Sequence, residues 1–494
     1  MRPDSKLLLR AATLLRPSDD LLPDQWADRN REFPPTAGKP GRWSTADAAY
    51  TRGPMRAAAS PRWDRCGFVI SSQNGKTQTA INIALCRIDQ EPTKVLYIGP
   101  TRDNVSTVIS PKVDQAIRLS PAMDAKAHYG QSWTKTLMPI AGVSFRLAWA
   151  GSPIQIAADD ACIVLIDEVD RTDRDIRGEG SIIELGDGRH GSYIDGKTIV
   201  FSTPTEGFVT TEVDDRTGLE HWARAEPDAL NSQMWEFWQD GTRHEYAIPC
   251  SACRTYFIPR LSRLFIPEGA TPIQARKEAR LCCPICEHGM TSEEVFEWGR
   301  KGVYLAPGQR AFLEDGDDVK AVLVEDMTVK PSLLEDVEFG DYMAPAVEET
   351  SDATFWCSGL ISYSRKNSIA RLAEAITKAR RTTDPNRIKT VTNTKFAEPY
   401  APPGERREWR TVHNCRAEYR LGDFPQEVGN RIAVATMGVD VQKLFLTWVV
   451  RLWTEGNNSW LLARGELNGE TDQPEVWRAL GQLLRRTYGG VPIY

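Results

Sequence analysis

Six consecutive residues near position 75 have the types and order that bind phosphate groups. A loop joining a strand to a helix holds anionic oxygens with its backbone N–H groups, while a lysine reaches the outer phosphates and a hydroxyl holds Mg²⁺. The apolar residues 68–70 predict the strand and residues 79–87 the helix, so Lys76 and Thr77 would take those two roles. One departure is Ile70, which stands where glycine is usual. We predict that ATP binds to Ser72, Gln73, Asn74, Gly75, Lys76 and Thr77.

Two adjacent carboxylates end a second apolar run, 163–166, which lies downstream of the loop. Four apolar residues predict a buried strand, and the tip of that strand would present Asp167 and Glu168. A carboxylate in this place holds Mg²⁺ through water, and a second one orients the water that attacks the γ-phosphate. We predict the first role for Asp167 and the catalytic role for Glu168.

A third apolar run, 198–201, ends in small hydroxyl residues. A strand tip of this kind near a nucleotide can sense the γ-phosphate through hydrogen bonds and pass the change to a moving domain. We predict this coupling role for Ser202, Thr203, Pro204 and Thr205. The order of the three segments is the order found in strand-swapped ATPases of the helicase and translocase type.

The elements that must position these residues form a repeating pattern of short apolar runs separated by helical stretches. The runs are rich in Val and Ile, as in buried parallel strands of an α/β sheet. The sequence therefore predicts an α/β fold of the P-loop NTPase type, with strands near residues 67–70, 94–100, 162–168 and 197–204.

Five of the ten cysteines fall within residues 250–286, in two CxxC pairs plus Cys282. Two such pairs can place four thiolates tetrahedrally around one zinc ion, and four sulfur ligands leave no open position for catalysis. We predict a structural Zn²⁺ site in a zinc-ribbon-like module. Cys282 could replace Cys283, and His288 is expected on the surface. The predicted ligands are Cys250, Cys253, Cys283 and Cys286.

Composition limits the class of protein. The 494 residues include 61 basic and 67 acidic side chains, giving a net charge of −6, so any nucleic-acid surface must be local. No apolar run approaches the roughly 18 residues of a membrane span, and the first 20 residues lack the pattern of a secretory signal. We expect a cytoplasmic protein without a membrane partner.

Two neighbouring segments have opposite charge. Residues 313–349 hold twelve acidic side chains and two lysines, which predicts a solvated excursion. Residues 363–395 hold nine Lys or Arg and two acidic residues, with Ile369, Leu372 and Ile376 at helical spacing. This basic stretch is either ordinary surface or a contact for a phosphate backbone.

The last part of the chain predicts a three-stranded meander from about residue 432, then a helix over 475–488 with Val476, Leu480, Leu483 and Leu484 on one face. Residues 491–494 predict the start of another strand. Asp440 would lie at the end of the first strand of the meander.

Taken together, these motifs resemble the large subunit of tailed-bacteriophage terminases, in the lambda-like branch. The resemblance rests on Gly41-Arg42-Trp43 through Tyr50 and Pro54, the loop 71–77, Gly151-Ser152-Pro153, Asp167 to Arg171, 202–205, the cysteine pairs and Gly438 to Gln442. It implies a motor that pumps double-stranded DNA into a procapsid and a ribonuclease H-like nuclease that cuts the concatemer. Implied partners are DNA, a small terminase subunit and the portal ring, with a homo-oligomer also expected, in the host bacterial cytoplasm.

The resemblance also guides the expected domains and leaves some questions open. In ribonuclease H-like nucleases a carboxylate at the position of Asp440 binds one of two divalent metals, and its partner comes from the fourth strand, so the nuclease is expected to be incomplete here. Other terminases often carry an arginine at the position of Ser72, so a transition-state cation must come from elsewhere: Arg102, Arg146, Arg171, Arg189 or a neighbouring subunit.

The expected divisions are an arm (1–60), an ATPase core (61–240), a zinc-ribbon-like insertion (241–305), an acidic excursion with a basic lid (306–425) and a partial nuclease (426–494).

Two alternatives fit the same motifs. One is a helicase-type ATPase that remodels nucleic acid without a capsid. The other is a catalytically inactive prophage remnant that only binds DNA or partners.

Overall fold

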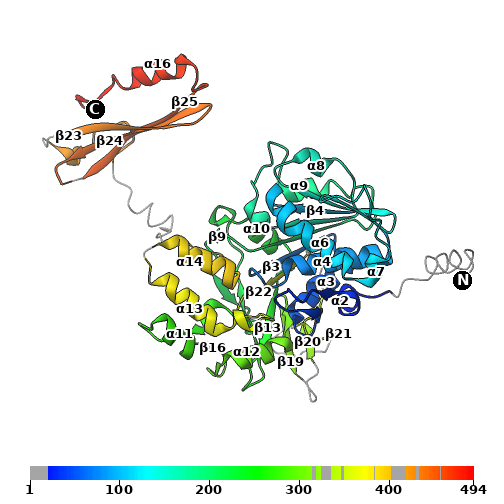
Figure 1. Ribbon diagram of the computed structural model, residues 1–494. Coiled ribbons are helices and arrows are strands. Elements are labelled where there is room, and N and C mark those ends of the chain that lie inside the picture. The colour runs from blue at the N-terminus through cyan, green and yellow to red at the C-terminus, as the bar shows by residue number, and fades with distance from the viewer. Residues whose placement is uncertain are drawn as a thin grey trace, which may run out of the picture. The chain divides into compact units, whose positions relative to one another are not determined.

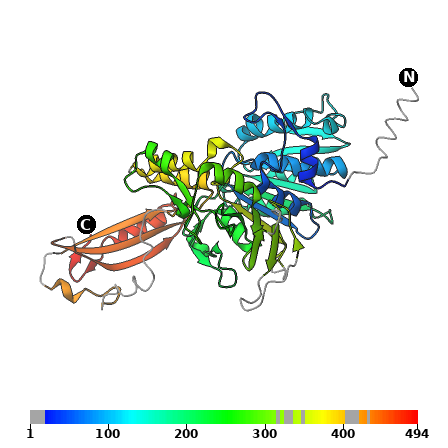
Figure 2. The ribbon, with the colours of Figure 1, turned by 90° about the horizontal axis from the view of Figure 1, so that it is seen from below.

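The computed structural model describes residues 20–313, 319–323, 335–345, 350–382, 384–401, 419–429, 433–456 and 458–494. The chain divides into two compact units, Met1–Pro403 and Gly404–Tyr494 (Figures 1 and 2). Within the described residues, no helix combines the length and the apolar character needed to cross a bilayer.

The larger unit is organised around a ten-stranded sheet, which confirms the predicted α/β class. Strands from β13 to β6 run parallel, whereas β5, β14 and β18 run antiparallel to their neighbours. The order across the sheet is β14 (Tyr256–Phe257), β13 (His244–Pro249), β22 (Asp352–Cys357), β3 (Arg65–Ile70), β8 (Lys197–Ser202), β7 (Ile163–Asp167), β4 (Val95–Gly99), β6 (Val143–Trp149) and β5 (Leu137–Ile140), with β18 (Val303–Leu305) paired to β13.

The four predicted strands are β3, β4, β7 and β8, and their order in space differs from their order in the chain. Strand β8 lies between β3 and β7. Its register places Ser202 beside Val69 of β3 and Phe201 beside Asp167 of β7. The carboxyl ends of all three strands therefore meet at one edge of the sheet.

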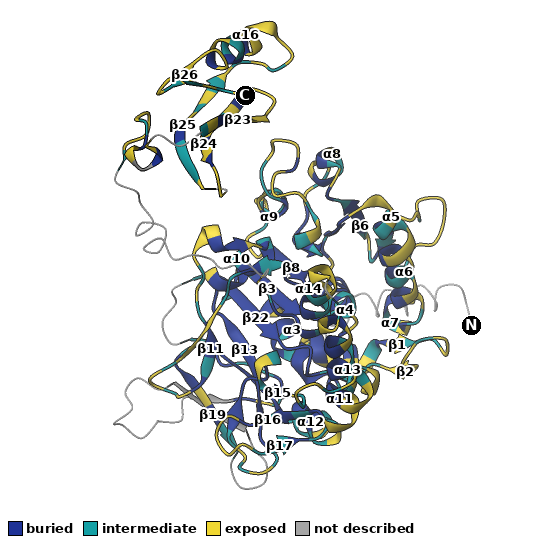
Figure 3. Ribbon diagram, turned by 90° about the vertical axis from the view of Figure 1, so that its left-hand side faces the viewer, coloured by how far each residue is buried: buried dark blue, intermediate teal, exposed yellow. Residues whose placement is uncertain are grey.

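Helices cover both faces of this sheet because successive residues of each strand point to opposite sides. In β3, Phe68 and Ile70 join one core and Val69 joins the other. The strands between these layers are buried along their length (Figure 3). The first core includes residues of α3 (Arg52–Ala59), α4 (Lys76–Gln90), α6 (Ser110–Arg118) and α7 (Pro121–Asp124), and the second those of α8 (Pro153–Ala157), α9 (Ile182–Asp187) and α10 (Gln233–Asp240).

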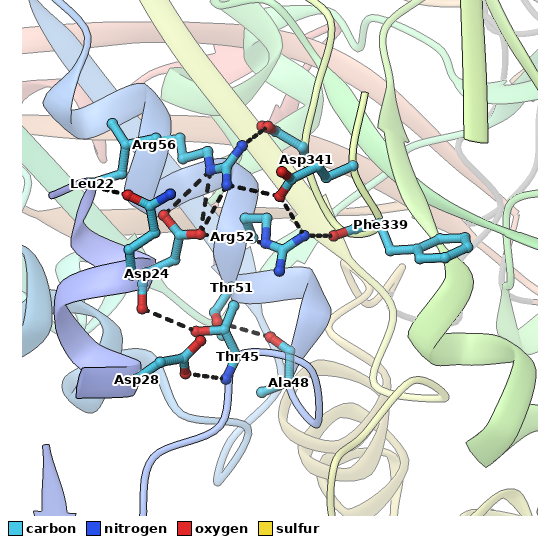
Figure 4. Close-up of polar contacts among 12 residues, drawn as sticks. Leu22, Asp24, Asp28, Thr45, Ala48, Thr51, Arg52, Arg56, Phe339 and Asp341 are labelled. Carbon is cyan, nitrogen blue, oxygen red and sulfur yellow. Dashed lines mark hydrogen bonds and ion pairs between the residues drawn. The ribbon is translucent and has the colours of Figure 1, made fainter. Parts of the chain in front are cut away.

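The described part of the N-terminal arm packs into the first core. Trp26 of α2 (Pro23–Asn30) and Met55 of α3 are fully buried. Arg52 and Arg56 of α3 extend from this arm toward the turn 338–341 (Figure 4). The arm also contains the short pair β1 (Glu32–Phe33) and β2 (Gly41–Arg42).

The acidic turn at residues 338–341 is held by these two arginines. Arg56 contacts Glu338 at 2.9 Å and Asp341 at 2.5 Å, and it also contacts Asp24 at 3.1 Å. Helix α3 therefore supplies counter-charges to this turn, while the Glu338 side chain is 63% exposed, and the solvated excursion stays a prediction. Residues 314–318, 324–334 and 346–349 of the same acidic stretch lie outside the described residues. The described remainder includes β20 (Val319–Leu323) and β21 (Glu335–Asp336), which form a small sheet with β19 (Gln309–Leu313).

The segment predicted as an insertion, 241–305, contributes to the main sheet as well as to a small module. Its strands β13, β14 and β18 belong to the sheet. The module contains the small sheet β15 (Leu264–Phe265), β16 (Arg280–Cys282) and β17 (Gly289–Met290), with α11 (Pro272–Glu278) and α12 (Ser292–Trp298).

The basic stretch forms α13 (Ile369–Arg380) and α14 (Pro385–Val391). Ile369, Leu372 and Ile376 are buried, as their helical spacing predicted. Helix α13 packs against α11, so the basic stretch and the module form one continuous part of the larger unit (Figure 1). The larger unit also contains two short antiparallel pairs, β9 (Glu206–Gly207) with β12 (Leu230–Asn231) and β10 (Thr211–Val213) with β11 (Glu220–Trp222).

The smaller unit confirms the predicted meander. Strands β23 (Ala433–Val441), β24 (Phe445–Thr454) and β25 (Ser459–Asn468) are antiparallel, with a bulge between Val450 and Arg451. Helix α16 (Pro474–Leu483) is shorter than predicted: Leu483 is its last residue, and Leu484 is exposed. Strands β26 (Thr487–Tyr488) and β27 (Val491–Pro492) follow, and Ile493 forms a parallel bridge to Ala435 of β23.

Candidate functional site

The phosphate-binding loop predicted from the sequence lies between β3 and α4. Gln73 has φ +63° and Gly75 has φ +90°, both in the left-handed region that glycine adopts without strain. Gly75 is the N-cap of the 15-residue helix α4, and no side chain caps that end. The N–H groups of the first helical turn therefore have no partner within the helix and can donate hydrogen bonds to a bound anion.

Two residues of the loop hold it to a distant part of the chain. The Asn74 amide is fully buried and donates to Ser71 Oγ at 2.8 Å and to the Ile361 carbonyl at 2.9 Å. It accepts from Ser362 Oγ at 2.7 Å. The Ser72 N–H donates to the Thr394 carbonyl at 2.8 Å. The Asn74 side chain therefore anchors the loop, and the sequence pattern gave no signal of this tertiary contact.

Lys76 and Glu168 contact each other directly across the sheet edge, through Nζ and Oε1. Glu168 follows β7 with φ +57°, a left-handed conformation that is uncommon for a residue with a side chain. Its N–H donates to the Phe201 carbonyl of β8 at 2.8 Å, which fixes this turn. Burial alone would raise the pKa of Glu168, but the charges of Lys76 and Arg171 outweigh burial and hold it below its usual value.

Asp167 has a different environment, although it is the neighbouring residue. Its carboxylate is buried and accepts a 2.9 Å hydrogen bond from the Tyr97 hydroxyl, which is also within hydrogen-bonding reach of Thr77. Burial raises the pKa of Asp167, and Lys76 only partly offsets this. Its Oδ1 is buried without a hydrogen-bond partner among the described residues. An unpaired carboxylate oxygen near a hydroxyl fits the needs of Mg²⁺, which prefers oxygen ligands.

Tyr97 is a residue of this site that the sequence analysis missed. It lies in β4, beside Leu165 of β7, and it is fully buried. An aromatic residue in an apolar run reads as core, so no sequence signal separates it from its neighbours.

The third predicted segment lies beside the other two. Ser202 Oγ is 3.4 Å from the Asp170 N–H, and Thr205 Oγ1 donates to Asp170 Oδ2 at 3.0 Å. Asp170 also accepts from the Met234 N–H at 2.7 Å and from the Ser232 hydroxyl. Burial raises the pKa of Asp170 to about 6. The buried carboxylate of Asp170 therefore joins three segments: the turn after Glu168, the tip of β8 and the start of α10.

Four arginines of this chain were proposed as the source of the transition-state cation, and Arg171 is one that contacts the site. Its Nε is 2.9 Å from Glu168 Oε2. Arg102 lies over the ring of Trp149, and Arg189 donates to the Ala157 carbonyl.

The four predicted zinc ligands converge. Their sulfur atoms all lie within 4.8 Å of one another, with 3.8 Å between Cys250 and Cys286 and 3.9 Å between Cys253 and Cys283. Four sulfurs at about 2.3 Å from one tetrahedral zinc are about 3.8 Å apart, so the geometry fits that ion. The cluster does not include Cys282. His288 contacts Glu294 of α12 at 3.1 Å.

A family model supplies the decisive comparison. The ATPase domain of the phage terminase large subunit gpA matches residues 37–303 of this 494-residue chain, which is more than half of it. The chain belongs to the phage terminase large subunit gpA family. The endonuclease domain of the same family matches residues 352–490.

The chain is also similar to individual terminases. The terminase large subunit of Escherichia phage lambda is 21% identical over 478 residues, which are 94% of this chain and 65% of the lambda protein. The chain thus spans slightly less than two thirds of that relative. Among solved structures, the large terminase of bacteriophage HK97 is 13% identical and covers 96% of this chain and 75% of its own, with a TM-score of 0.41. The ATPase domain of the Thermus phage P74-26 large terminase is 18% identical over 37% of this chain and 66% of its own, with a TM-score of 0.26.

The boundary of the gpA endonuclease model differs from the boundary of the compact units. The model begins at residue 352, where β22 starts, but β22 pairs with β3 and β13 in the larger unit.

In the smaller unit of this gpA-family chain, Asp440 is exposed in β23 and accepts a 2.7 Å hydrogen bond from Gln442. Among the described residues, no cluster of three or more metal-binding side chains includes Asp440. Its role as a nuclease ligand stays a prediction.

Proposed function

We propose that this chain is an ATP-driven motor that packages double-stranded viral DNA into procapsids, and that it carries a ribonuclease H-like nuclease region. The observation that carries the proposal is the direct contact between Lys76 Nζ and Glu168 Oε1. It brings the phosphate loop and the paired carboxylates to one place, as ATP hydrolysis requires.

The strand order supports a P-loop ATPase of the strand-swapped type. In that type, a strand separates the phosphate-loop strand from the strand that bears the carboxylates, and here β8 lies between β3 and β7. The tip of β8 therefore lies at the same sheet edge as the loop after β3 and the acids at the end of β7, which is where a γ-phosphate sensor belongs.

Each residue of the site has a proposed role. Lys76 and the open N–H groups of α4 hold the phosphates, and Thr77 and Asp167 would hold Mg²⁺, which neutralises phosphate charge when bound. Glu168 orients the attacking water, since its lowered pKa keeps it ionised. Arg171, beside Glu168, is the proposed cation for the transition state within this chain. The coupling segment is Ser202, Thr203, Pro204 and Thr205, joined to α10 through Asp170.

The proposed nuclease region is the smaller unit. Its antiparallel strands β23, β24 and β25, followed by a helix and by a parallel bridge back to β23, support a ribonuclease H-like arrangement. Asp440 would bind one divalent metal there. The proposed partners are DNA, a small terminase subunit, the portal ring and further copies of this chain, in the cytoplasm of the host bacterium.

Hydrolysis measurements test the motor proposal. We expect the purified chain to hydrolyse ATP, and we expect DNA together with portal-bearing procapsids to raise the rate several-fold. Strand separation of a duplex without any response to procapsids would favour the helicase-type alternative. A chain with no hydrolysis even in the presence of DNA would contradict the proposal and support the inactive remnant.

We also propose that the four-cysteine cluster binds one structural Zn²⁺. The cluster supports α12 through two contacts to Glu294, from Ser251 Oγ at 2.8 Å and from His288 at 3.1 Å. Hydrogen bonds at the helix start hold the pKa of Glu294 at about 2, despite the opposing effect of its partial burial.

Removing one ligand should release the metal and loosen this module. For Cys253→Ser we expect zinc content to fall from about one equivalent to near zero and the melting temperature to drop by several degrees, since structural zinc contributes of the order of 10 kcal/mol in small modules. Metal analysis and calorimetry measure both. Cys282→Ser is the matched control and should keep the zinc. Full zinc content in the Cys253 variant would contradict this ligand set.

A further inference from the structure

A basic pocket lies between the zinc module and the basic helices of the larger unit. It has a volume of about 510 Å³ and is lined by α11, the start of α12, residues 362–368 and the first turn of α13. One acidic residue, Glu293, lies in the wall. The cations in the wall are Arg276, Lys277, Arg280, Arg365, Lys366 and Arg371.

Half of these cations already have partners. Arg276 and Arg371 lie 3.6 and 3.8 Å from Glu374, and Arg280 donates to the Ala279 carbonyl at 2.8 Å. In contrast, no carboxylate in the described part of the chain pairs with Lys277, Arg365 or Lys366, and all three are exposed. The pocket therefore keeps positive charge that is not compensated by its own walls.

The backbone adds to this positive potential. Helix α13, with 12 residues, begins in the pocket, and the side chain of its N-cap Ser368 does not cap it. The positive end of the helix dipole thus faces the same space as the lysines. Ser364 and Asn367 in the wall offer further hydrogen bonds to phosphate oxygens.

The chemistry of the wall favours a phosphate backbone over a free nucleotide. A nucleotide pocket usually offers an aromatic or apolar face to the base. The one aromatic residue of the wall is Phe296, and Arg300 and Arg365 stand over its ring at 4.5 and 5.1 Å. The one aromatic ring of the wall is thus already in contact with two cations, whereas Lys277 and Lys366 remain for phosphate.

The pocket also shares a residue with the support of the ATP loop. Ser362 lines the pocket and donates to Asn74 at 2.7 Å. The contact between Ser362 and Asn74 therefore links the wall of the pocket directly to the phosphate loop.

We propose that this pocket binds the phosphate backbone of duplex DNA, with Lys277 and Lys366 as the principal contacts. This inference rests on the proposed function, and it places one DNA contact of the motor beside the support of its phosphate loop. Within the basic stretch 363–395, the proposal limits the expected DNA contact to the N-terminal end. The cations at the C-terminal end of α13 do not line the pocket.

The test is DNA affinity of the full chain without nucleotide, so that failure of ATP hydrolysis cannot affect it. The probe is a fluorescein-labelled duplex of mixed sequence, measured by anisotropy at several salt concentrations. For Lys277→Ala/Lys366→Ala we expect a loss of affinity between roughly 10- and 100-fold near 0.1 M salt and a salt slope lower by roughly 2. Lys277→Arg/Lys366→Arg should retain the affinity.

The control removes two cations from the C-terminal end of α13, the helix whose first turn lines the pocket. Lys378→Ala/Arg380→Ala should bind within about twofold of the unaltered chain, because neither residue lines the pocket. An equal loss in the control, or unchanged affinity in the lysine variant, would overturn the proposal. So would displacement of the duplex by ATP or inorganic phosphate at matched phosphate concentration, which would indicate a general anion site.

Discussion

Lys76→Ala is expected to lower the rate of ATP hydrolysis by at least about 10³-fold, to the background of the assay. The Lys76 ammonium contacts Glu168 at the sheet edge, and the open helix N-terminus of α4 lies beside it. Without it, the charge that develops on the phosphates would lose its closest fixed cation. Initial rates at saturating ATP and Mg²⁺ measure the effect.

The fold should survive this change, because Glu168 keeps Arg171 as a partner at 2.9 Å. A melting temperature within a few degrees of the unaltered chain would show this. Lys94→Ala is the matched control: this lysine precedes β4 at the opposite edge of the sheet and pairs with Asp159 and Asp160. Hydrolysis by the Lys76 variant at even a tenth of the normal rate would contradict the assignment of the loop.

Glu168→Gln is expected to separate nucleotide binding from hydrolysis. The amide cannot accept a proton from water, so we expect kcat to fall by roughly 10²- to 10⁴-fold. Affinity for ATP should stay the same or increase, because the carboxylate that repels the phosphates and occupies Lys76 has been removed. Single-turnover hydrolysis and binding of a fluorescent ATP analogue measure the two quantities.

Glu179→Gln provides the control for this substitution, since that glutamate is exposed and lies outside the site. Loss of ATP binding together with loss of hydrolysis would mean that Glu168 supports the loop and does not act on water. A normal kcat would assign the base to another residue, and Asp167 would then be the next to test.

The contrast between Asp167 and Glu168 supports the two different roles that we propose for them. Asp167 is the last residue of β7, buried against Tyr97, and its pKa is raised mainly by burial. Glu168 turns away in the left-handed conformation and meets two cations, which lower its pKa. Adjacent carboxylates with opposite shifts are the pattern expected for two different roles.

The direct contact between Lys76 and Glu168 has a consequence for the roles that we propose. Phosphates that bind the loop would compete with Glu168 for the lysine ammonium. The two variants above test this competition, because each removes one of its partners.

The sequence by itself determined the local parts of this protein. Short runs of Val and Ile predicted β3, β4, β7 and β8, and the helical spacing of Ile369, Leu372 and Ile376 predicted the buried face of α13. The loop, the paired acids and the cysteine pairs were visible because each depends on residues close together in the chain.

Only the tertiary structure decided which strands are neighbours and which side chains meet across them. Buried parallel strands all have similar apolar sequences, so nothing local indicates that β8 lies between β3 and β7 or that β22, nearly 300 residues after β3, pairs with it. The same is true of Tyr97 beside Asp167, of Ser362 on Asn74 and of the pocket formed by α11 and α13. These contacts depend on packing between segments that are far apart in the chain, and residue types and local spacing do not predict such packing.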